Sequence, residues 1–120
     1  ANEVNLEMSK YIVDRIEADN GGALQGKSVL VVGVAYKPNV ADVRETAAEL
    51  VIDECRARGA EVSWHDDLVK EWHGEKSSNL SDAEISIVIT KHDSVDNELI
   101  KASAPYVFDT TGKVQAVSQF

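Results

Sequence analysis

Apolar positions along the chain follow two patterns, which predict strands alternating with helices. Runs rich in Val, Ile and aromatic residues predict strands at 28–35, 61–65, 85–89 and 106–108. The first and third runs are apolar at nearly every position, which is typical of parallel strands covered on both faces. The second run alternates and fits a place nearer the edge of a sheet.

Apolar residues at spacings of three and four predict helices at 2–20, 46–58 and 94–102. For the second of these, Thr46 and Glu49 match a capping box, in which each side chain bonds a free backbone N–H of the first turn. The remaining segments predict a loop with a short helix at 66–78, a helical turn at 79–84 and a loosely packed tail at 112–120.

Alternation of strands and helices indicates an α/β fold with right-handed crossovers. We expect a three-layer αβα, Rossmann-like parallel sheet, preceded by an N-terminal helix at 2–20. That helix carries more apolar surface than an isolated arm needs. It either packs on the domain or belongs partly to a structure upstream.

Composition narrows the function classes. The chain has 120 residues, 43% of them hydrophobic, and a net charge of −9, which disfavours nucleic acid as a partner. No apolar run approaches the roughly 20 residues of a membrane span, and the start does not resemble a signal peptide. Cys55 is the only cysteine, so an intrachain disulfide and a cysteine-based zinc cluster are excluded, and a cytoplasmic protein is expected.

The segment 33–45, GVAYKPNVADVRE, lies between a predicted buried strand and a predicted helix, where α/β sheets place ligand-binding groups. It offers two cations, Lys37 and Arg44, together with Tyr36. Two cations close together in so acidic a chain indicate an anionic ligand. Only Gly33 follows the strand, so this is no dinucleotide fingerprint, and the backbone is not expected to wrap a pyrophosphate.

Other polar residues follow the predicted strands at the same edge. His65 ends the second strand and His92 follows the third, where a loop-capping role is expected for His92. Asp66 resembles the acidic residue that follows the second strand in ribose-binding folds. His73 is expected to be exposed, and Cys55, on the apolar stripe of its helix, to be a buried hydrophobe.

The segment 33–45 resembles the signature that opens the C-terminal domain of UDP-glucose/GDP-mannose dehydrogenases, the nucleotide-sugar 6-dehydrogenases. Three more blocks, 1–5, 59–66 and 108–112, resemble this family in the same order. The resemblance implies that 23–120 is the UDP-sugar-binding domain. It also implies that 1–22 is a linker helix from a central domain that this sequence does not include.

The same resemblance implies roles for individual residues. Tyr36 and Lys37 would contact the UDP-sugar, and Arg44 would lie toward the NAD side of the cleft between domains. For Arg44, an ion pair with a neighbouring carboxylate that shapes the loop is an equal alternative. Thr111 stands where many relatives carry an arginine that reaches the substrate phosphates, so that contact is either missing or supplied by Lys113.

The activity implied for the whole enzyme is NAD-dependent oxidation of a sugar C6 alcohol to a carboxylate, for cell-surface polysaccharide precursors. The catalytic cysteine and most of the NAD site would lie in other domains. We therefore expect no catalytic or metal-ligating residue in this chain, and no dehydrogenase activity from it alone. The parent is expected to form a homodimer or larger assembly. The sugar, and the choice between UDP and GDP, stay open.

Two other functions are compatible with the sequence. One is a stand-alone nucleotide-binding or regulatory Rossmann-like module, and the other is an interaction or dimerisation domain that uses the first helix. The chain begins inside a helical pattern and has no initial Met, which favours a fragment of the dehydrogenase.

Overall fold

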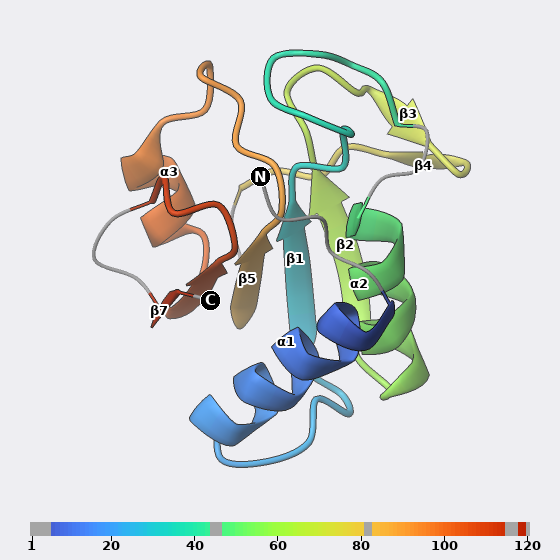
Figure 1. Cartoon of the computed structure of the whole chain (residues 1–120), viewed down its shortest axis with the longest axis vertical. Coiled ribbons are helices and arrows are strands. Elements are labelled where there is room, and N and C mark those ends of the chain that lie inside the picture. Colours follow the sequence, from blue (N-terminus) through green and yellow to red (C-terminus); the bar gives the residue numbers. More distant parts are fainter. Residues whose placement is uncertain (1–5, 44–46, 81–82, 115–117, 120) are drawn as a thin grey trace.

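The computed structural model describes residues 6–43, 47–80, 83–114 and 118–119, which form an α/β fold around one parallel sheet (Figure 1). The sheet has the order β2-β1-β5-β6-β7 and consists of Ser28–Val32 (β1), Glu61–His65 (β2), Ile85–Val88 (β5), Tyr106–Asp109 (β6) and Ser118–Gln119 (β7). The helices are Leu6–Asp19 (α1), Ala47–Ala57 (α2) and Asn97–Ala102 (α3). The predicted Rossmann-like sheet with its preceding helix is confirmed.

β1 is apolar because it is covered on both faces. Val29 and Val31 face the core that α1 and α2 cover, whereas Leu30 and Val32 face a second core under α3. All four side chains are at most 1% exposed. Alternate side chains of a strand point to opposite faces, so a strand between two helical layers needs apolar residues throughout.

α1 packs on the domain through one face. Ile12, Val13 and Ile16 have no exposed surface and belong to the same core as α2. Elsewhere on the helix, Leu6 is 57% and Tyr11 is 54% exposed. The structure is therefore compatible with both alternatives for this helix. It packs on the domain, and it leaves apolar side chains exposed for contact with a structure upstream.

An arginine just after the end of α2 links α2 to α1. The guanidinium of Arg58 lies 2.7 Å from Asp14 Oδ1, 2.7 Å from Glu17 Oε1 and 2.9 Å from Glu54 Oε2. Burial lowers the pKa of Arg58, but the hydrogen bonds to these carboxylates outweigh burial and raise that pKa above its ordinary value. The cluster holds α1 against α2.

Three sequence predictions are corrected. The short helix expected in 66–78 is instead an antiparallel hairpin of Glu71–Trp72 (β3) and Glu75–Lys76 (β4). Its two turn residues, His73 and Gly74, have φ of 51° and 76°. A two-residue type I′ turn requires positive φ at both positions. At 79–84 the described residues, 79–80 and 83–84, are not helical. In the tail, which was expected to pack loosely, the described residues Ser118–Gln119 pair in parallel with β6 as β7.

The remaining boundaries agree within a few residues. α3 is shorter than predicted and begins after Asp96, whose Oδ1 accepts the N–H of Glu98 at 2.8 Å as an N-cap. The capping box of α2 rests partly on Thr46, which lies outside the described residues. In the described part of the chain, no helix is both long and apolar enough to cross a membrane.

Candidate functional site

The loops after β1, β2 and β5 meet at the carboxyl edge of the sheet, at its upper end in Figure 1. In parallel α/β sheets this edge is where ligands bind. Residues 33–43, 66–70 and 89–93 form these loops. Contacts between the three loops determine which groups are free to meet a ligand.

The carboxylate of Asp66 is the centre of this edge and is fully buried. It accepts hydrogen bonds from five N–H groups contributed by all three loops. At Oδ2 the donors are the backbone of Val34 (2.9 Å) and Ala35 (3.1 Å), and at Oδ1 they are the backbone of Leu68 (2.8 Å) and Val69 (3.1 Å) and His92 Nε2 (2.8 Å). Both oxygens of Asp66 are thus used inside the protein, so a ribose contact by Asp66 is ruled out.

The position of Asp66 changes what the loop after β1 can bind. In dinucleotide-binding folds, backbone N–H groups of this loop face a phosphate. Here the N–H groups of Val34 and Ala35 face the protein's own carboxylate. An anionic ligand at this edge must therefore be held by side chains rather than by these amides.

His92 and Asn39 fasten the loop after β1 to the loop after β5. The buried His92 donates from Nε2 to Asp66, and its Nδ1 accepts the backbone N–H of Asn39 at 2.8 Å. This pair of contacts fits a neutral imidazole with its proton on Nε2. The side-chain oxygen of Asn39 also accepts the N–H of Asp93 at 2.9 Å. The loop-capping role expected for His92 is confirmed.

Gly33 lets the same two loops approach closely. Its φ is 87°, and a Cβ at this position would lie 1.8 Å from the carbonyl oxygen of Thr90. Thr90 in turn donates from Oγ1 to the carbonyl of Ala35 at 2.8 Å. A side chain at position 33 is excluded by both backbone conformation and space.

Tyr36 and Lys37 lie at the rim of this edge. Tyr36 is 50% exposed, Lys37 is also exposed, and the Tyr36 N–H donates to the carbonyl of Asp42 at 2.5 Å. Neither side chain has a hydrogen bond, ion pair or ring contact with any other described residue. Arg44 lies outside the described residues, so the structure leaves its predicted role open.

A second histidine at this edge is bonded differently. His65 Nδ1 lies 2.5 Å from the carbonyl oxygen of Ser78, and its Nε2 lies 2.8 Å from Asp67 Oδ1. Both partners can only accept, so both bonds form together only when the imidazole carries two protons. Asp67 is further held by the hydroxyl of Ser94, at 3.0 Å from Oδ2.

Asn39 was missed in the sequence analysis. The signal was available: Pro-Asn is a turn pair, because Pro presets its own φ and Asn tolerates the left-handed region. Asn39 does adopt a φ of 66°. What the pair could not indicate is that the Asn39 N–H would meet the ring of His92.

Residues 30–116 match the UDP-glucose/GDP-mannose dehydrogenase family, UDP binding domain. The chain belongs to this family.

Two relatives illustrate the extent of the similarity. The UDP-N-acetyl-D-mannosamine dehydrogenase of Methanocaldococcus jannaschii is 31% identical over 100 residues, which are 81% of this chain and 23% of that protein. The UDP-glucose 6-dehydrogenase TuaD of Bacillus subtilis is 26% identical over 111 residues, covering 82% of this chain and 24% of its own length. The chain thus spans about a quarter of each relative.

The fold is also shared with a solved relative. The UDP-N-acetyl-mannosamine dehydrogenase Cap5O from Staphylococcus aureus superposes with a TM-score of 0.73 at 24% identity, over 97% of this chain and 31% of that chain.

This UDP-binding domain departs from the expected pattern at Thr111, and the structure shows what the threonine does. Its N–H and hydroxyl donate to Asp109 Oδ1 at 2.9 and 2.7 Å, and the N–H of Val114 donates to Asp109 Oδ2 at 3.0 Å. Thr111 therefore closes a turn after β6. Lys113, in the same turn, is exposed.

Cys55 is a core residue of the UDP-binding domain, as predicted. It has no exposed surface. Burial raises the pKa of the Cys55 thiol to about 12, against a smaller opposing effect of the Arg58 charge. A thiol that stays protonated near neutral pH does not act as a nucleophile.

Proposed function

We propose that this chain is the nucleotide-sugar-binding domain of an NAD-dependent UDP-sugar 6-dehydrogenase. Residues 23–120 would form the binding unit, and 1–22 would be the linker helix from a central domain. The observation that carries the proposal is that the side chains of Tyr36 and Lys37 are exposed at the carboxyl edge and have no partner among the described residues.

Binding would follow from what each group offers. Lys37 would donate to the diphosphate, and Tyr36 would line the nucleotide-sugar beside it. The amides of Val34 and Ala35 are occupied by Asp66, so the charged side chain would provide the main attraction for the phosphates. Lys113 would be a second cation at this edge in place of the arginine of many relatives.

The described residues do not fit a dinucleotide cofactor at the loop after β1, because Asp66 already occupies the amides that would face its pyrophosphate. NAD would therefore be held mainly by parts of the parent outside this chain, with Arg44 as the contact from this domain. This chain would contribute binding and orientation of the sugar, which can lower a barrier by several kcal/mol. The isolated chain would be inactive.

We also propose the wider setting that family membership suggests. The parent would oxidise the C6 alcohol of its sugar to a carboxylate, supply cell-surface polysaccharide precursors in the cytoplasm, and act as a homodimer or larger assembly. The relatives named above differ in their sugars, so the sugar stays open.

A titration of the chain tests the proposal. UDP, UDP-sugars, GDP-mannose and NAD are added in turn while amide chemical shifts are followed. UDP-sugars are expected to move the signals of residues 34–43 saturably, and NAD is not. Lys37→Gln should weaken UDP-sugar binding about tenfold, which corresponds to about 1.4 kcal/mol.

Lys10→Gln is the matched control, because Lys10 is an exposed lysine of α1 and the charge change is the same. It should leave UDP-sugar binding unchanged. Equal weakening by the two substitutions would mean that overall charge, not Lys37, attracts the ligand. Binding that both variants retain in full would contradict the role of Lys37.

A further inference from the structure

A cavity of about 190 Å³ lies between α2 and the β3–β4 hairpin. It shares no residue with the loops after β1 and β5. Its lining comes from α2, β2 and the hairpin, and consists of Glu49, Ile52, Asp53, Arg56, Trp64, Trp72, His73 and Glu75. Ligand pockets for drug-sized molecules are usually larger, at about 300–1,000 Å³, so this one suits a single side chain.

Aromatic rings form much of the lining. Trp64, only 2% exposed, meets Trp72 edge to face, with ring centroids 6.0 Å apart and an angle of 84°. The ring of His73 lies against Trp72 at 4.4 Å. Aromatic faces carry partial negative charge and attract cations, guanidinium groups in particular.

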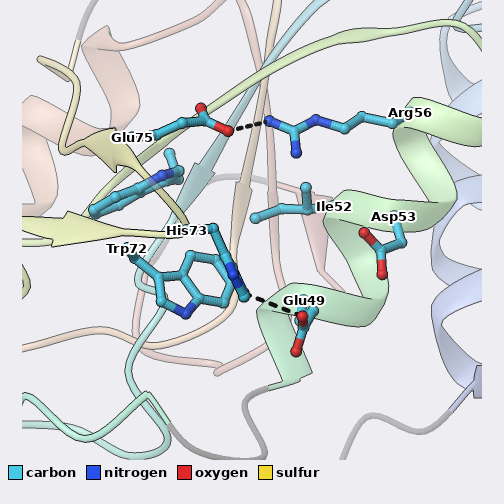
Figure 2. A pocket seen from close by; sticks show the side chains of 8 residues that line it. Glu49, Ile52, Asp53, Arg56, Trp72, His73 and Glu75 are labelled. Carbon is cyan, nitrogen blue, oxygen red and sulfur yellow. Dashed lines mark hydrogen bonds and ion pairs between the residues drawn. The ribbon is translucent and has the colours of Figure 1, made fainter.

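Two polar contacts join α2 to the hairpin across the cavity, with Ile52 between them (Figure 2). His73 Nε2 lies 3.1 Å from Glu49 Oε1, and Arg56 Nη2 lies 2.8 Å from Glu75 Oε1. These contacts hold the two walls together. Each also uses one carboxylate of the cavity.

The third carboxylate of the cavity is left over. Asp53 is exposed and has no hydrogen bond or ion pair with any described residue. Three carboxylates thus face one guanidinium and one imidazole, so the cavity has a surplus of negative charge. In addition, Trp64 Nε1 is buried and lacks a hydrogen-bond partner in the described structure, which is uncommon for an indole N–H.

We propose that this cavity binds the side chain of an arginine from a protein partner. The guanidinium stacks on the Trp72 ring and is paired by Asp53. Charge complementarity selects arginine: the cavity supplies aromatic faces and a free carboxylate, and arginine combines a planar cation with a long apolar stem. The inference does not depend on the nucleotide-sugar function.

The two tryptophans of the chain both line the cavity, so their indole signals report on it directly. The probe is N-acetyl-arginine-amide, followed by tryptophan fluorescence and by the two indole N–H resonances. N-acetyl-citrulline-amide, which has nearly the same shape without the charge, is the control ligand. Arginine-amide is expected to shift both indole signals saturably, with at least tenfold tighter binding than citrulline-amide.

Asp53→Asn should weaken binding of the arginine probe at least fivefold. Glu98→Gln removes the same charge from an exposed position of α3 and should leave it unchanged. Equal binding of arginine-amide and citrulline-amide would overturn the proposal without recourse to any variant, and so would full binding by Asp53→Asn. Lys37→Gln should leave the arginine probe unaffected, which separates this site from the nucleotide-sugar site.

Discussion

Two histidine–aspartate pairs at the carboxyl edge share the same contact distance and differ in chemistry. In both, the Nε2 of the histidine lies 2.8 Å from an aspartate oxygen: His92 with Asp66, and His65 with Asp67. The difference lies at the other ring nitrogen, which meets a backbone N–H in His92 and a carbonyl oxygen in His65. The partner of that second nitrogen decides how many protons the ring needs.

The surroundings differ as well. The side chains of His92 and Asp66 are at most 1% exposed, whereas those of His65 and Asp67 are 15% and 32% exposed. In the buried pair, the two oxygens of Asp66 accept hydrogen bonds from five N–H groups. The more exposed pair lies next to water. A charge is tolerated in the interior only when enough hydrogen bonds stabilise it, and Asp66 meets that condition.

Replacement of Gly33 tests the close packing around the buried pair. Of the substitutions considered, it is expected to lower the free energy of unfolding the most. Gly33→Ala brings a Cβ against the backbone of Thr90 and forces alanine into a positive φ. It should lower the free energy of unfolding by about 4 kcal/mol. The measurement is urea denaturation followed by circular dichroism.

Gly74→Ala is the matched control for that substitution. Gly74 has a similar φ of 76° in the hairpin, but a Cβ there has nothing within 4 Å. Its cost should be limited to the backbone penalty of about 1 kcal/mol. Equal effects of the two substitutions would show that the loops after β1 and β5 are not packed as tightly as described.

The two aspartates provide the next test. In Asp66→Asn an NH₂ group replaces one acceptor oxygen and faces N–H donors, so the free energy of unfolding should fall by about 3 kcal/mol. Asp67→Asn alters a partly exposed pair and should cost less than about 1 kcal/mol. Urea denaturation of both variants under one set of conditions gives the comparison. A larger effect at Asp67 would contradict it.

The proton positions of the two rings give the smallest and most direct test. Where the contacts of the structure are made, long-range ¹⁵N–¹H spectra of the imidazoles should show a proton on both nitrogens of His65. For His92 they should show a proton on Nε2 alone. His65→Gln and His92→Gln identify the signals. Finding His92 doubly protonated and His65 singly protonated under these conditions would reverse the assignment.

The sequence predicted well what depends on local pattern. The apolar run of β1 predicted a strand covered on both faces, since every position of that strand must be apolar. The stripe that contains Cys55 predicted a buried thiol in the same way. The motif of segment 33–45 resembled one family, and residues 30–116 match that family.

Errors arose where an element has too few residues to show a period of apolar positions. β3 and β4 have two residues each, too few for a period to be detected, and they form because a turn at His73 and Gly74 pairs them. β7 also has two residues and exists only because β6 offers it an open edge. Hydrophobic periodicity within a window of sequence predicts neither the β3–β4 hairpin nor β7.

The sequence by itself determined the layers of this domain. The spacing of apolar residues within each helix or strand indicates whether one face or both faces are buried. Only the tertiary structure decided which hydrogen bonds the polar residues at the carboxyl edge of the sheet make. Asp66 receives N–H groups from residues up to 32 positions away, and the proton count of each histidine depends on a backbone group from another loop. Hydrogen bonds need atoms within about 3 Å, and only the fold brings these atoms together.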